Sequence, residues 1–182
     1  HPVEMVFGLH NWPGLPAGQI SVTEGPVMAG TDRFEITITG RGGHAAMPHQ
    51  GVDSIVAGAQ LVQALQTVVS RNLHPCESAV VSVTQFHAGE AWNIIPEEVV
   101  LRGTIRSFKS EVQETVERAI ERLCSGIAAA NGAQIGVHFD HRYPATVNSV
   151  SEANFCREVA AEVFGQERVL TDVLLSMGAE DF

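Results

Sequence analysis

The sequence predicts an α+β fold, in which a ferredoxin-like β-α-β-β-α-β unit is inserted into a second, α/β domain. Three observations lead to this prediction. Segments with apolar residues at every second position alternate with segments whose apolar residues recur at helical spacing. Between residues 31 and 141 their order is β-α-β-β-α-β. After Tyr143-Pro144 the pattern changes, and both flanks of the unit fit pieces of another domain.

The strands of the unit are indicated by a period of two. In the first of them Phe34, Ile36 and Ile38 alternate with polar residues, as in a half-buried strand. The predicted strands cover residues 34–39, 78–87, 98–108 and 133–139. Two helices would cover one face of this antiparallel sheet, and the other face needs polar side chains or a partner.

Two helices are predicted between these strands. The first begins at Asp53 or Ser54, both good helix caps. The second is capped by Ser110, with Gln113 placed for a capping box, and ends at Asn131-Gly132. The expected apolar faces are Ile55, Ala59, Val62, Leu65 and Val69 in the first helix and Val112, Val116, Ala119, Ile120, Leu123 and Ile127 in the second.

Residues 1–30 and 142–182 are assigned to the second domain. Residues 3–9 are predicted to form a strand covered on both faces, because almost no polar residue interrupts them. A helix over residues 151–164 is expected to begin at a Ser151 cap and to end at Gly165. Since the chain begins with His1 instead of methionine, we expect a piece of a longer or processed protein.

The composition argues against nucleic acid and membranes as binding partners. The formal net charge is −10 and Lys109 is the single lysine, so the basic surface needed for nucleic acid or an anionic membrane is missing. No apolar run is long enough to span a bilayer. Cys76, Cys124 and Cys156 are odd in number and widely spaced, which favours buried thiols in a reducing compartment and a cytoplasmic protein.

His10 is the first candidate functional residue. It follows the predicted strand 3–9 and precedes a turn rich in proline and glycine. Ligands of α/β sheets gather at the carboxyl ends of strands, and a neutral imidazole there can bind a divalent cation. The alternative is a loop histidine with no ligand.

His44 is the second candidate. It lies in the Gly-rich stretch 42–49, which lacks the Lys-Ser/Thr ending of a phosphate-binding loop. Its imidazole could act as a general acid or base, or as a donor to an oxyanion. The alternative is a surface loop whose histidines bond only to the backbone.

Asn93 and Arg106 form the third candidate group. If they lay close together, an amide and a guanidinium could hold a substrate carboxylate. The alternatives are a turn residue and a solvated strand arginine. His138 and His141 are three residues apart on a predicted strand and should face opposite sides, so we do not expect them to chelate one ion. Spacing alone does not place Glu180 and Asp181.

Taken together, several stretches resemble the M20 family of metallopeptidases and amidohydrolases. The resemblance is closest to the branch of hippurate hydrolases and N-acyl-amino-acid amidohydrolases. The matching stretches follow the family's order along nearly the whole chain and cover residues 8–18, 25–30, 40–49, 93–96, 143–148 and 177–182.

The resemblance implies a catalytic α/β domain that carries two divalent metal ions (Zn, Mn, Co or Ni) and an inserted lid domain that mediates homodimerisation. It implies that His10 is a metal ligand and that His44 is the lid histidine that steadies the oxyanion. Asn93 and Arg106 fall where the family holds the substrate's carboxylate. The implied substrate is an N-acyl amino acid.

The chain also departs from the family pattern. The family's early Cys-Gly-His-Asp-type motif, its Glu-Glu pair and its C-terminal histidine have no counterpart here. One glutamate of that pair is the general base, so we expect the 182 residues alone to be inactive. Two other functions stay open: a non-catalytic dimerisation or binding module, and a dipeptidase or carbamoyl-amino-acid hydrolase of the same superfamily.

Overall fold

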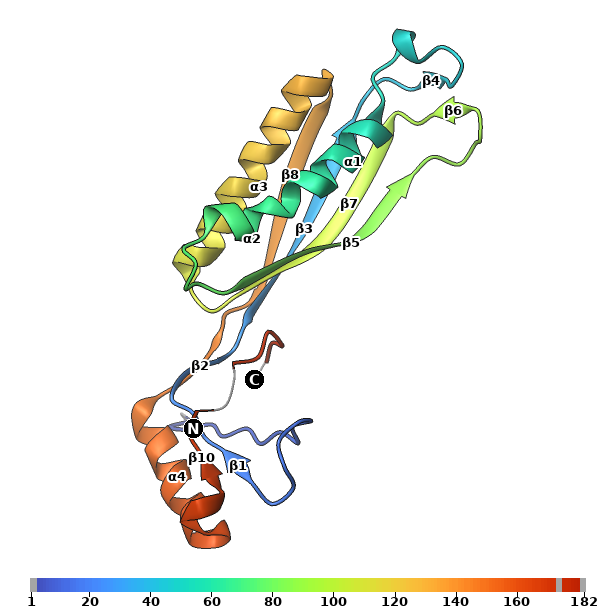
Figure 1. Cartoon of the computed structure of the whole chain (residues 1–182). Coiled ribbons are helices and arrows are strands. Elements are labelled where there is room, and N and C mark those ends of the chain that lie inside the picture. The colour runs from blue at the N-terminus through green and yellow to red at the C-terminus, as the bar shows by residue number, and fades with distance from the viewer. Residues whose placement is uncertain (1–2, 173–174, 181–182) are drawn as a thin grey trace.

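A computed structural model of the chain describes residues 3–172 and 175–180 (Figure 1). Its largest sheet is four-stranded and antiparallel, in the order β5-β7-β3-β8. The strands are β3 (Gly30–Thr39), β5 (Ala79–Ala88), β7 (Glu98–Ser107) and β8 (Gln134–Tyr143). This is the strand order of a split β-α-β unit, and it confirms the predicted ferredoxin-like arrangement.

Three helices pack on one face of this sheet (Figure 1). They are α1 (Ser54–Leu65), α2 (Thr67–Asn72) and α3 (Ser110–Asn131). Phe34, Ile36 and Ile38 of β3 are almost fully buried beneath them. The opposite face carries polar side chains, among them Glu35 and Arg102, which form an ion pair at 2.6 Å.

The apolar face predicted for α3 is confirmed, because Val112, Val116, Ala119 and Ile120 are buried. Its end is confirmed as well, since Gly132 adopts the left-handed conformation with φ of 68°. The predicted Ser110 cap is wrong by one position. Lys109 is the cap residue, and no side chain bonds there.

The face predicted for α1 is confirmed only in part, because Leu65 is buried and Val62 packs against the core but Ile55 and Ala59 are exposed. Asp53 caps the helix by accepting from the N–H groups of Ile55 and Val56. Ile55 is 40% exposed, whereas Ala57, Gly58 and Leu61 are buried. A Cβ on Gly58 would lie 3.0 Å from the ring of Phe86, so the small residues let α1 approach the sheet closely. Small residues together with Leu61 and Leu65 therefore form the face that this helix turns toward the sheet.

Another group of elements lies where β3 begins and β8 ends (Figure 1). The short pairs are β1 (Ile20–Ser21) with β10 (Val169–Leu170), and β2 (Gly25–Met28) with β9 (Thr146–Asn148). Helix α4 (Val150–Phe164) has Ser149 as its cap residue, two positions before the predicted Ser151, and ends at Gly165 as predicted. A 3-10 turn, η2 (Gln166–Arg168), follows it.

The strand predicted for residues 3–9 is wrong. These residues pair with no strand among those that the structure describes, and they are exposed. A strand covered on both faces needs neighbouring strands to take up its N–H and C=O groups, and the described residues offer none. Within the described residues, no helix has the length and apolar character to cross a membrane.

Candidate functional site

One group of candidate residues lies beside β2. The Nε2 atom of His10 is 2.5 Å from an Oε atom of Glu180, whose side chain is only 14% exposed. The C-terminal turn reaches this position because Ala29 donates its N–H to the carbonyl of Gly178 at 2.9 Å. The imidazole of His10 also meets the indole of Trp12 edge-on, with ring centroids 6.5 Å apart.

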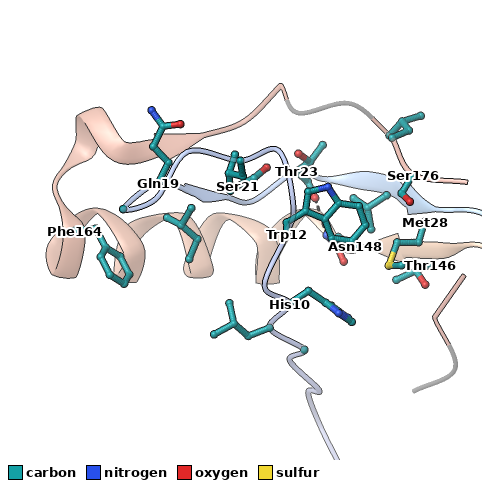
Figure 2. Close-up of a pocket in the computed structure, with 17 residues that line it drawn as sticks. His10, Trp12, Gln19, Ser21, Thr23, Met28, Thr146, Asn148, Phe164 and Ser176 are labelled. Atoms are coloured by element: carbon teal, nitrogen blue, oxygen red, sulfur yellow. Dashed lines mark hydrogen bonds between the residues drawn. The ribbon is translucent and has the colours of Figure 1, made fainter. Parts of the chain in front are cut away.

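His10 and Trp12 line a cavity of about 480 Å³ (Figure 2). Met28 and Thr146, which are cross-strand partners on β2 and β9, form another part of its wall. The cavity therefore joins segments from both ends of the chain, and its lining mixes apolar and polar groups as small-molecule sites do.

The His10 and Glu180 pair fits a divalent metal ion chemically. Imidazole nitrogen and carboxylate oxygen are the donors that Zn²⁺, Mn²⁺, Co²⁺ and Ni²⁺ accept. A carboxylate in contact with an imidazole either shares the ion or orients the metal-bound ring. The spacing of residues along the sequence did not assign Glu180 to a site. The fold of the chain brings its side chain to His10. Asp181 lies outside the described residues.

A second group lies at the far end of the large sheet, where β4 (Gly43–His44) pairs with β6 (Ile94–Ile95) (Figure 1). The N–H of Ala45 donates to the carbonyl of Asn93 at 2.9 Å, so His44 and Asn93 lie on neighbouring segments. The 3-10 turn η1 (Pro48–Gln50) follows β4. Ser54 fixes the connection to β7 by donating its hydroxyl to the carbonyl of Pro96 at 2.7 Å.

The tautomer of His44 follows from its one intramolecular bond. Its Nδ1 accepts a hydrogen bond from the N–H of Ala46 at 3.1 Å. A neutral imidazole that accepts at Nδ1 carries its proton at Nε2. The ring is exposed, and among the described residues no group bonds Nε2. This atom can therefore donate to another group.

Arg106 does not join this second group within one chain. It lies near the other end of β7, opposite Thr31 and Val80. The stretch of β7 from Glu98 to Arg106 spans roughly 26 Å at ~3.3 Å per residue. The structure thus does not support the premise that Asn93 and Arg106 lie close together in one subunit.

The expected orientation of His138 and His141 is confirmed. His138 pairs with Glu35 on the open face of the sheet, and His141 pairs with Asp32 on the face toward α3. They cannot chelate one ion together.

With this geometry in view, comparison with known proteins decides the family. A family profile described as a peptidase dimerisation domain of the M20 type matches residues 29–131, which is more than half of the chain. The chain belongs to the M20 family. The matched range covers strands β3, β5 and β7 of the large sheet and helices α1 to α3, and it ends before β8. It therefore includes His44, Asn93 and Arg106.

Relatives of this M20 protein are amidohydrolases and deacetylases. It is 43% identical over 180 residues to an N-acetylcysteine deacetylase of Bacillus subtilis, with 99% of this chain and 47% of the relative covered. It is 37% identical over 179 residues to a hippurate hydrolase of Campylobacter jejuni, with 98% and 47% covered. The chain thus spans about half the length of the curated relatives it matches.

Solved structures agree with the fold. A Bacillus subtilis protein described as a dinuclear metal-binding peptidase of the M20 family superposes with a TM-score of 0.73 at 35% identity. The alignment covers 93% of this chain and 41% of that one.

Proposed function

We propose that the protein acts in metal-dependent hydrolysis of the amide bond of N-acyl amino acids, with hippurate (benzoylglycine) as a model substrate. The names of the relatives, an N-acetylcysteine deacetylase and a hippurate hydrolase, support this substrate class. In this proposal residues 31–141 form the lid and dimerisation domain, and residues 1–30 and 142–182 contribute to the catalytic domain. Three free cysteines agree with a cytoplasmic location.

The proposed roles follow from chemistry and position. His10 and Glu180 would help to hold the divalent ions, two per complete subunit. When bound, the ions supply the Lewis acidity that activates water for attack on the amide carbonyl. His44 would donate its Nε2 proton to the developing oxyanion. Asn93 and Arg106 would bind the substrate carboxylate, the arginine through two parallel bonds.

One observation carries the arrangement of this site. The β4–β6 pair, which contains His44 and follows Asn93, lies at one end of the large sheet, and β2, which borders the His10 cavity, lies beyond its other end (Figure 1). Within one subunit the length of the sheet separates these two groups, so they would not reach one small substrate together. We therefore propose a homodimer in which His44 and Asn93 of one subunit complete the site that contains His10 and Arg106 of the other.

The testing experiment measures glycine release from benzoylglycine by the full-length protein, after metal removal and after addition of Mn²⁺ or Zn²⁺. We expect release that requires the ion and is abolished by His10→Ala. The control is His74→Ala, another exposed histidine, which should leave activity unchanged. Glycine release that changes neither on metal removal nor in His10→Ala would overturn the proposal. Cleavage of dipeptides only would indicate a peptidase, and no cleavage at all a binding module.

A further inference from the structure

A second cluster of metal-ligating side chains lies at the base of the lid domain, away from His10. Asp32 of β3 and His141 of β8 are direct cross-strand partners, and Glu117 reaches them from α3. The Nδ1 atom of His141 is 3.2 Å from Asp32 Oδ1 and 3.6 Å from Glu117 Oε1. One ligand atom from each residue lies within 4.8 Å of the other two.

Gln113 bridges two members of this cluster. Its side-chain amide lies 2.8 Å from His141 Nδ1 and donates to Glu117 Oε1 at 3.2 Å. The Nδ1 atom of His141 therefore faces the amide and two carboxylate oxygens. A cation among Asp32, Glu117 and His141 would take the place of the amide donors and bind the three ligand atoms directly.

Burial strengthens this argument. The side chain of Asp32 is only 9% exposed and that of Glu117 is 20% exposed. A buried carboxylate is costly unless an opposite charge compensates it. Among the described residues, no lysine or arginine forms an ion pair with either carboxylate. A divalent ion would supply the missing positive charge.

We propose that Asp32, Glu117 and His141 form a structural cation site for Zn²⁺ or a similar divalent transition ion, separate from the proposed catalytic site. One imidazole nitrogen and two carboxylate oxygens suit such an ion. His141 is 58% exposed, which leaves an entry path and room for a water ligand. Strands β3 and β8 connect the lid to the rest of the chain here, so the ion would clip both strands to α3 (Figure 1).

The test uses the 182-residue chain carrying His10→Ala, so that the other candidate ligand is absent. Metal-free protein is titrated with Zn²⁺ in a calorimeter, and its melting temperature is followed. We expect saturable binding of one ion per chain and a higher melting temperature, because an ion that binds only the folded chain stabilises it. His141→Gln or Asp32→Asn should weaken binding at least ~10-fold.

The matched control is His138→Gln on the same strand, because His138 faces the opposite side of the sheet. It should bind Zn²⁺ as the His10→Ala chain does. Absence of saturable binding, or binding unchanged by His141→Gln, would overturn the proposal. If His141→Gln or Asp32→Asn does not fold, the site is tested by adding Co²⁺ to the His10→Ala chain and recording its NMR spectrum. Selective paramagnetic shifts of the His141 imidazole resonances support the site, and unshifted resonances refute it.

Discussion

A local hydrogen bond favours one tautomer of the His44 imidazole before any substrate is present. The N–H of Ala46 donates to Nδ1, which favours the proton on Nε2 and leaves it available to another acceptor. Because the donor is held by local backbone geometry, little reorganisation would be needed when an oxyanion forms.

We predict that His44→Ala in the full-length enzyme lowers kcat for benzoylglycine on the order of 10²-fold, as expected when one oxyanion donor is lost. Steady-state kinetics provide the measurement. His49→Ala, in the same exposed loop, serves as the control and should change kcat little. A kcat for His44→Ala within about twofold of the unmodified enzyme would exclude this role.

Cys124 is a thiol that burial keeps protonated. Its side chain lies in the core, where the residue is 2% exposed, and desolvation raises its pKa from 9.0 to about 11. The folded state therefore holds this proton over a pH range in which the unfolded chain releases it. The resulting stability is fully present below pH 9 and is lost as the pH rises toward about 11.

We predict that urea unfolding of the 182-residue chain shows this loss between pH 9 and about 11. Cys124→Ala should reduce the pH dependence of the unfolding free energy by up to about one proton per chain, although the variant is less stable overall. The exposed Cys76→Ala is the control and should keep the full dependence. If the unfolding free energy of Cys124→Ala and that of Cys76→Ala changed equally with pH, the buried thiol would not contribute to the pH dependence.

At the scale of single elements, β7 contains a glycine that the packing requires. A Cβ at Gly103 would lie 2.2 Å from both the ring of Phe34 and the carbonyl oxygen of Ser82. The carbonyl belongs to the neighbouring strand and cannot move aside without breaking the sheet. By contrast, a Cβ at Gly136 on β8 would meet nothing within 4 Å.

We predict that Gly103→Ala lowers the unfolding free energy by about 1–3 kcal/mol or more, since it overpacks the core. Gly136→Ala should be neutral or stabilising by up to ~1 kcal/mol, because it restricts only the unfolded chain. Denaturant unfolding of both variants makes the comparison. Equal stability of the two would mean that β7 can shift to accept the added methyl group.

The elements differ in how well they could be predicted. Helix α3 was predictable because its apolar stripe is long and regular, whereas α1 presents small residues to the sheet and leaves Ile55 exposed. The periodicity of hydrophobic residues identifies a face made of large apolar side chains. It does not identify a helix face whose small residues allow the helix to pack close to a sheet. The strand order followed from the β-α-β-β-α-β pattern, but residues 3–9 pair with no strand in the part of the chain that the structure describes.

The candidate sites show the same limit. His44 and Asn93 could be singled out from the sequence, and the pairing of β4 with β6 brings them together. Glu180 comes to His10, and Glu117 to Asp32, only through contacts between distant segments. Such contacts leave no trace in local spacing, so these carboxylates could not be assigned from the sequence.

At the scale of the whole molecule, the separation of the two residue groups leads to a prediction about subunit mixing. In the full-length enzyme, His10→Ala should abolish activity and His44→Ala should leave about a hundredth of it or less. If the site is shared between subunits, the mixed dimer has one intact site and one that carries both changes. An unfolded and refolded equal mixture should then recover about a quarter of the unmodified activity, since half of the dimers are mixed.

The activity of the mixture, measured as glycine release, distinguishes the two arrangements. Recovery near this level supports a site shared between subunits. No recovery, with the mixed dimer shown to form by mass spectrometry of tagged subunits, would place both histidines of a working site in one subunit.

If the proposed site is shared between subunits, the position of His44 at the far end of the large sheet has a consequence for dilution. A reaction that needs two chains obeys mass action, so turnover per chain would fall once the protein concentration drops below the dissociation constant of the dimer. Turnover per chain would then depend on the abundance of the protein as well as on its substrate, and a modest rise in expression would raise total flux more than in proportion.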